Sequence, residues 1–210
     1  MSRLAEDLVL LLLDDSSGRS TVDMNRRHRA VGAAVLLDLV RAGRIRIPVT
    51  PEGKEPRVDV LDTTPTGNPA LDAALRRMGT KSMKVGWAAD NLGQVCWKPL
   101  LELLATDGAI RLEEQRTLGL IKTKTWPAED GTRERTIRQA IAAALGGAHP
   151  DEETSVLITI LHAIGAVPGA ADDATRARAA EIARSGWASG PLREAFHGLD
   201  TAWLVTLYAG

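Results

Sequence analysis

The chain has 210 residues, of which 44% are hydrophobic and 25% are charged, and its formal net charge at pH 7 is −1. This is the composition of a globular protein long enough for one large domain or two small ones. The charge excludes a global attraction to phosphate-rich partners. Cys96 is the only cysteine, which excludes an internal disulfide and a multi-cysteine zinc site.

The N-terminal region contains an unbroken apolar run from Leu8 to Leu13, which ends at Asp14 and Asp15. A membrane-spanning helix needs roughly 20 apolar residues. The region also lacks the basic start and the cleavage site of a signal peptide. We therefore expect a buried core helix here, in a cytoplasmic protein.

Two segments share a pattern in which an apolar helix ends at a glycine and a β-hairpin follows. The first consists of a helix over about 28–42 and a hairpin over about 44–61. The second ends its helix at Gly108 and continues into a hairpin over 110–126, whose return strand is expected over 117–126. The repetition predicts two similar local structures about 65 positions apart.

After Asp130 the chain is predicted to be helical to its end. A periodic segment over 132–145 is ended by a pair of glycines, and Asp151 is the expected N-cap of the next helix. No low-complexity segment or long linker separates these parts. The sequence therefore predicts one domain over 1–210, mainly α-helical with short β-hairpins.

The stretch 62–69, Asp-Thr-Thr-Pro-Thr-Gly-Asn-Pro, is the most conspicuous turn-forming segment. Its hydroxyls, glycine and amide can cradle a phosphate. However, it has a single glycine and lacks the Gly-Lys-Ser of a P-loop. We interpret it as a structural turn that caps a helix over 70–78, with a phosphate cradle as the alternative.

The densest basic cluster, Arg26, Arg27 and Arg29, lies around the expected start of the first long helix. Most charge runs are solvated surface. The alternative is a phosphate or headgroup site, because guanidinium groups form paired hydrogen bonds with phosphate and a helix start adds its dipole. Asp23 nearby weighs against this alternative.

The hairpin over 110–126 carries apolar residues where its tip is expected. These are Leu118, Leu120 and Ile121, with Lys122 beside them. An exposed tip of this kind suits a membrane surface, a partner chain or self-association. The alternative is a strand whose apolar side chains pack inward.

Local motifs for catalysis, metal binding or cofactor binding are not found in the sequence. The four histidines are widely separated, and none has the spacing of metal ligands. Adjacent acidic pairs such as Glu113 and Glu114 diverge on a helix or a strand, so they are poor acid–base couples. Sequence alone does not exclude a triad that assembles in space, but we expect a non-catalytic protein without a metal or cofactor.

Several strings occur in a definite order along the chain: 4–8 (Leu-Ala-Glu-Asp-Leu) with the Leu run that follows, 36–45, 64–75, 161–163 and 180–182. Together they resemble the Golgi phosphoprotein 3 family over nearly the whole chain. The resemblance implies a mostly helical single domain with a protruding amphipathic hairpin that contributes to membrane contact and oligomerisation. It also implies peripheral attachment through phosphatidylinositol 4-phosphate; Golgi members also link enzyme tails or a myosin to that membrane.

The residues that form the phosphoinositide pocket in this family are not retained. When the family is aligned on Gly18, Gly43 and Gly108, its pocket tryptophan and three arginines correspond to residues of other types in this chain. We therefore expect no recognition of phosphatidylinositol 4-phosphate of the Golgi type. The replaced positions are Asp23, Gly32, Gln94 and Trp97, and the cations close enough to form a substitute headgroup site are Arg26, Arg27, Arg29 and Lys98.

Two functions from different classes are consistent with these features. The first is a membrane-peripheral binding or adaptor protein. The Ala-, Arg- and Gly-rich composition suits a bacterium, in which such a protein is expected in the cytoplasm or at the inner membrane face. Its partner would be an anionic lipid or a protein, with homo-oligomerisation through the hairpin as a further expectation. The second is a winged-helix-like nucleic-acid or protein-interaction module, although nucleic-acid binders usually have a pI above about 9.

Overall fold

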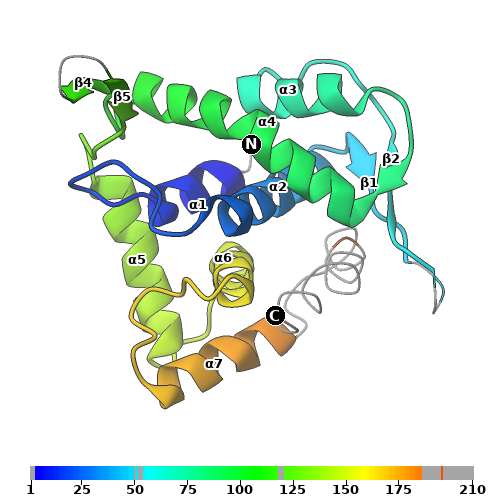
Figure 1. Cartoon of the computed structure of the whole chain (residues 1–210). Coiled ribbons are helices and arrows are strands. Elements are labelled where there is room, and N and C mark those ends of the chain that lie inside the picture. The colour runs from blue at the N-terminus through cyan, green and yellow to red at the C-terminus, as the bar shows by residue number, and fades with distance from the viewer. Residues whose placement is uncertain (1–2, 50, 52–53, 118–120, 186–194, 196–210) are drawn as a thin grey trace.

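The structure, a computed structural model, describes residues 3–49, 51, 54–117, 121–185 and 195. These residues form seven α-helices and five short strands, which confirms the mainly helical fold class (Figure 1). Within the described part of the chain, none of the helices is long and apolar enough to cross a membrane. The helices are α1 (Leu4–Leu12), α2 (Met24–Arg41), α3 (Pro69–Met78), α4 (Val85–Thr106), α5 (Thr132–Leu145), α6 (Glu152–Ala163) and α7 (Asp173–Arg184).

Helix α2 begins at Met24, four residues before the expected start at 28. The reason is the Asp23 side chain, which caps the helix by accepting hydrogen bonds from the backbone N–H groups of Asn25 and Arg26. The arginines of the basic cluster therefore lie inside the first two turns of the helix rather than before it. The other predicted helix limits agree closely: α5 spans 132–145, and Asp151 caps α6.

The strands form two small antiparallel sheets. In the first, β1 (Ile45–Arg46) pairs with β2 (Arg57–Val60), which confirms the hairpin, and β3 (Met83–Lys84) adds a third strand that was not expected. In the second, β4 (Glu113–Thr117) pairs with β5 (Ile121–Thr125). The predicted return strand over 117–126 was wrong at its start, because Thr117 belongs to β4 and pairs with Ile121.

The core is built around α2, whose residues from Ala30 to Val40 are all buried. This helix packs mainly against α4 and also contacts α1, α3 and α6. The apolar run from Leu8 to Leu13 is buried, as expected of a core helix. In Figure 1, α4 crosses α2 and reaches from the three-stranded sheet to the β4–β5 hairpin. Helix α4 therefore connects the two regions of β-structure.

Helices α2 and α4 cross in backbone contact at two glycines. A Cβ atom on Gly32 would lie 1.8 Å from the carbonyl oxygen of Ala89, and one on Gly93 would lie 1.7 Å from that of His28. Both distances are shorter than any non-bonded contact, and the atoms in the way belong to backbone. Each glycine is therefore required by the close approach of the two helices.

We predict that Gly32→Ala lowers the free energy of unfolding by about 3 kcal/mol or more, because the helices must move apart to admit the methyl group. This loss exceeds the gain of roughly 1 kcal/mol that alanine brings to a helix interior. Urea denaturation followed by circular dichroism measures the change. The matched control is Gly146→Ala at the end of α5, where the nearest atom would be 3.3 Å from the new Cβ. Equal stability of Gly32→Ala and the control would contradict the crossing.

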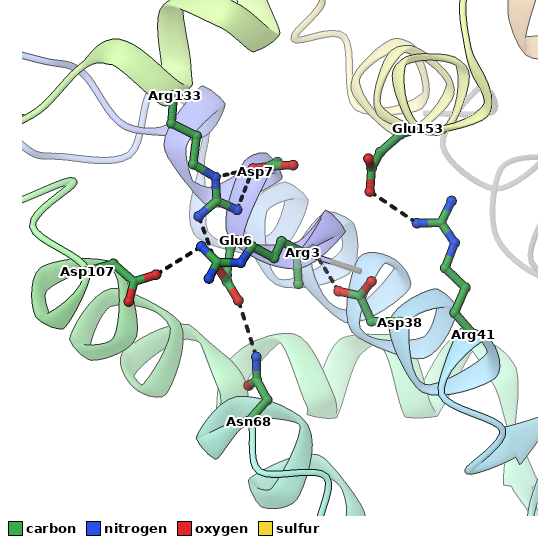
Figure 2. A network of polar contacts seen from close by, with 10 residues as sticks. Arg3, Glu6, Asp7, Asp38, Arg41, Asn68, Asp107, Arg133 and Glu153 are labelled. Carbon is green, nitrogen blue, oxygen red and sulfur yellow. Dashed lines mark hydrogen bonds and ion pairs between the residues drawn. The ribbon is translucent and has the colours of Figure 1, made fainter. Parts of the chain in front are cut away.

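A buried ion pair joins α1 to α5. Glu6, with a side chain only 5% exposed, lies 3.0 Å from Nη1 of Arg133, and the Nε of Arg133 donates to Asp7 at 2.7 Å (Figure 2). Removing one partner from such a group leaves an uncompensated buried charge and costs about 3–5 kcal/mol. Arg133 therefore holds two carboxylates that would otherwise destabilise the core.

The same network reaches the neighbouring helices. The side-chain amide of Asn68, at the start of α3, donates to Glu6 at 3.2 Å, and the backbone N–H of Ala5 donates to Asp38 on α2 at 3.0 Å. Helix α1 has no capping side chain of its own, so the carboxylate of Asp38 satisfies one of its free N–H groups from another helix. Figure 2 shows these contacts converging on α1 from α2, α3 and α5.

Burial raises the pKa of Asp7 from 3.8 to about 6, although Arg133 opposes the shift. A carboxyl group whose pKa is higher in the folded state than in the unfolded state contributes stability at pH values below its unfolded-state pKa. That contribution is lost as the pH rises through its folded-state pKa. Relative to Asp7→Asn, we therefore expect the wild-type free energy of unfolding to fall between about pH 4 and pH 7, by up to about 3 kcal/mol. Denaturation of both proteins at these two pH values provides the measurement. If the difference rises with pH instead, attraction by Arg133 outweighs burial.

Candidate functional site

The turn over 62–69 is structural, as interpreted from the sequence. The Asn68 side chain caps α3 by accepting from the N–H groups of Ala70 and Leu71 at 2.9 and 3.2 Å. The backbone N–H and the hydroxyl of Thr66 both donate to Asp72, at 2.6 and 2.7 Å. The groups that would cradle a phosphate are thus used within the protein.

The basic cluster at the start of α2 divides between different acidic partners. Arg26 pairs with Asp23 at 3.2 Å, and the side chains of both are 56% exposed. Arg29 pairs with Asp90 on α4 at 3.0 Å. Exposed pairs of this kind are weak, so the guanidinium of Arg26 remains accessible at the surface.

Arg27 takes a different position, over the ring of Trp97. Its guanidinium carbon lies 4.3 Å from the ring centroid, within the distance of a cation–π interaction. Its Nη2 atom is 3.2 Å from Nε2 of His28. Lys98, next to Trp97 on α4, has a side chain 74% exposed and pairs with Glu102 at 3.3 Å. Of the four predicted headgroup residues, Arg27 and Lys98 therefore adjoin a common tryptophan.

The four positions that correspond to the family's pocket have other roles here. Asp23 is the cap of α2, and Trp97 carries Arg27 on its ring. Gly32 is closed by the backbone of Ala89, so an arginine there would require the helices to separate. Gln94 is an exposed residue of α4. The substitutions thus change the shape of the region as well as its charge.

A groove with a volume of about 450 Å³ lies between α4 and the base of the β4–β5 hairpin. Two tryptophans contribute to its wall, and two lysines lie at its edge. Leu112 adds an apolar side chain that is 44% exposed. The groove is lined by Trp97, Lys98, Leu101, Glu102, Ala105, Thr106, Leu112, Lys124 and Trp126.

The groove brings Lys98 together with the base of the predicted membrane hairpin. Lys124 on β5 has a side chain 56% exposed and pairs with Glu114 at 3.4 Å. Trp126 follows β5, and its backbone N–H donates to the carbonyl of Gly18 at 3.2 Å, which ties the hairpin base to the loop after α1. Ile121 and Lys122 belong to β5, whereas Leu118 and Leu120 lie outside the described residues.

Sequence reasoning did not identify the groove, although its residues were visible. The sequence indicates Trp97 only as a replaced pocket residue, and it places Leu112 in the hairpin segment without a partner on α4. The available signal was the placement of Trp126 and Lys124 at the end of a hairpin strand, since paired tryptophan and lysine are typical of interfacial surfaces. The sequence does not show that the base of the hairpin packs against α4.

The described residues offer neither a reactive thiol nor a metal-binding cluster. Cys96 is buried, its Sγ lies 3.3 Å from the carbonyl oxygen of Ala70, and burial raises its pKa to about 12. The nucleophilic thiolate is therefore negligible at neutral pH. No group of three or more potential metal ligands occurs in the described part of the chain.

Comparisons with known proteins identify the family. No curated protein matches the chain in a sequence search. The family model for Golgi phosphoprotein 3 (GPP34) matches residues 4–198, which is nearly the whole chain. The match includes α1 with its buried Glu6, the α3 cap at Asn68 and the β4–β5 hairpin. The chain belongs to the Golgi phosphoprotein 3 family.

Proposed function

We propose that this protein is a non-catalytic binding protein that attaches peripherally to an anionic membrane surface. The observation that supports this proposal is the groove beside the hairpin, where two tryptophans, Trp97 and Trp126, lie with two exposed lysines, Lys98 and Lys124. Each lysine pairs with an exposed glutamate, and exposed pairs of this kind are weak and screened by salt, so the ammonium groups remain accessible to a partner surface. Tryptophan favours the boundary between lipid and water, because its ring is apolar and its N–H is polar. Lysine extends its ammonium group past an apolar stem toward the headgroups.

The sequence of the hairpin adds apolar and basic residues to the proposed membrane-binding surface. Leu118, Leu120 and Ile121 provide apolar groups for shallow insertion, and Lys122 provides a further cation. A two-stranded ribbon is marginally stable alone in water, so a contact with lipid or with a second copy of the chain would stabilise it. We include homo-oligomerisation through the hairpin and an adaptor role toward a protein partner in the proposal.

The proposed attachment depends on charge and apolar surface rather than on one phosphoinositide. Arg29 is paired with Asp90, and Gly32 leaves no room for a second arginine at the crossing. Recognition of phosphatidylinositol 4-phosphate of the Golgi type is therefore not part of the proposal. The proposed place of action is the cytoplasmic face of the inner membrane of a bacterium. A nucleic-acid-binding role is the less favoured alternative, because the net charge is −1.

We predict that Lys98→Gln with Lys124→Gln weakens binding to phosphatidylglycerol vesicles by about tenfold or more, since each lysine near an anionic surface contributes about 1 kcal/mol. Co-sedimentation at low and high salt measures the effect, and the wild-type binding should weaken as salt rises. Lys81→Gln with Lys84→Gln, at exposed positions around β3, is the charge-matched control. Equal losses in both double variants would remove the groove from the proposal. Stronger wild-type binding to phosphatidylinositol 4-phosphate at equal membrane charge would restore the Golgi type of recognition, and a wild-type shift of duplex DNA would favour the nucleic-acid alternative.

We predict separately that Leu118→Asp with Leu120→Asp leaves the thermal unfolding temperature unchanged but abolishes vesicle binding and any self-association. The reason is that carboxylates oppose both shallow insertion and an anionic surface. Sedimentation velocity and vesicle co-sedimentation give the two results. Unfolding of the double variant would instead show that these leucines pack into the core.

A further inference from the structure

The outer face of the three-stranded sheet carries charged side chains at its paired positions. Directly opposite residues of an antiparallel pair lie on the same face of a sheet, so Arg46 shares a face with Asp59, and Arg57 shares one with Lys84. These two pairs lie on one common face, because Arg57 and Asp59 are alternate residues of β2. The opposite, inner face carries the apolar residues Ile45, Val58, Val60 and Met83.

Two cations of the outer face, Arg57 and Lys84, lie directly opposite each other. Like charges in opposite positions destabilise a sheet, because their Cβ atoms are only about 5 Å apart. Arg46 differs from them, since Asp59 pairs with it at 3.2 Å. Lys84 pairs with Glu55 at 2.7 Å, but both side chains are at least half exposed, so this pair is weak. An anionic group that contacted both cations would therefore relieve a repulsion within the sheet.

The guanidinium of Arg57 is held in place without a carboxylate partner among the residues that the structure describes. Its Nε donates to the hydroxyl of Ser82 at 3.1 Å, and its Nη2 donates to the carbonyl oxygen of the same residue at 2.8 Å. A guanidinium has five N–H donors, so the others remain for a ligand. Because Arg57 is already oriented, its side chain loses little conformational freedom when it binds.

The neighbouring chain adds further positive charge. The segment 73–89, which runs from α3 through β3 into α4, contains no acidic residue and four cations, namely Arg76, Arg77, Lys81 and Lys84. Since the whole chain has a formal net charge of −1, the other residues together carry −5. Lys81 is exposed and forms no ion pair with any described residue. This part of the surface therefore attracts anions, although the protein as a whole does not.

The partner that fits this surface best is an acidic peptide segment. A membrane-binding face combines cations with apolar side chains that insert between lipids, and the paired residues of the outer face include none. Single-stranded nucleic acid binds where its bases stack on aromatic rings, and these positions hold no aromatic residue either. A guanidinium, by contrast, can hold a carboxylate through two parallel hydrogen bonds. Arg57 and Lys84 together thus match neighbouring carboxylates of an extended chain.

This surface is separate from the groove beside the hairpin. Strand β3 directly precedes α4, whereas the groove lies along the last turns of α4 (Figure 1). A helix rises 1.5 Å per residue, so roughly 20–30 Å of α4 separates the two regions. They share no residue, so a membrane contact at the groove and a peptide contact at the sheet can be changed independently.

We propose that the outer face of the three-stranded sheet binds an acidic segment of a partner protein, whose carboxylates contact Arg57, Lys81 and Lys84. The inference deepens the proposed function, because it rests on the adaptor role and gives its protein partner a chemical class. It does not require membrane attachment, since the peptide contact uses other residues.

Fluorescence anisotropy with the full chain tests the proposal. The probe is fluorescein-labelled hexaglutamate, and labelled hexaglutamine is its uncharged control. At low salt we expect submillimolar binding of hexaglutamate only, which weakens as salt rises. Arg57→Gln with Lys84→Gln should weaken it about tenfold or more, because two charge-assisted contacts are lost.

The charge-matched control is Arg19→Gln with Arg135→Gln, which removes two exposed cations from other parts of the surface. This variant should bind hexaglutamate as the wild type does, and thermal unfolding shows that each variant is folded. Equal losses in the two double variants would show attraction by overall charge alone and overturn the proposal. The absence of hexaglutamate binding by the folded wild-type protein would overturn it as well.

A second arm separates this surface from a membrane contact and from a nucleic-acid contact. Arg57→Gln with Lys84→Gln should bind phosphatidylglycerol vesicles as the wild type does, and a loss of vesicle binding would assign the sheet to the membrane contact and overturn the proposal. Tighter wild-type binding of fluorescein-labelled hexathymidylate than of hexaglutamate would identify a nucleic-acid surface and also overturn it. If the wild type binds hexaglutamate but no vesicles, membrane attachment fails and the proposal stands.

Discussion

The contact between α2 and α4 at Gly32 and Gly93 is the constraint on which much of the rest depends. Two helices that meet backbone to backbone leave no space for side chains at the crossing, so the polar residues next to it are displaced to its edges. Arg27 comes to lie over Trp97, and Arg29 comes to lie beside Asp90. The close crossing thus explains why a basic cluster that is continuous in sequence is divided in the structure.

The polar network around Glu6 gives a physical meaning to the strings that mark the family. Buried ionic groups seldom add net stability over apolar packing, but leaving one without its partner is costly. Here Glu6 lies in α1, Arg133 lies in α5 and Asn68 is the cap of α3, so the contacts among them join three helices. The string around Asn68, one of those that resemble the family, therefore supports the fold rather than a ligand.

Membership of the family establishes the fold, whereas the chemistry of the surface belongs to this chain. The scaffold places a hairpin at the end of α4 and a helix start beside the middle of α4. In this protein the first place carries tryptophans and lysines, and the second carries amides with compensated charges. The same architecture therefore presents two surfaces of different polarity.

The sequence by itself determined the features that depend on neighbouring residues. The span 132–145, the cap at Asp151 and the turn before α3 were predicted closely, because periodicity and capping are local properties of the chain. The family was also evident from the order of its strings. Only the tertiary structure decided that β3 joins β2, since a two-residue strand gains its stability from a distant partner. It likewise decided that Gly32 lies in a helix crossing and that Trp126 and Lys98 share a groove, because these contacts join residues far apart in sequence and depend on how the helices pack.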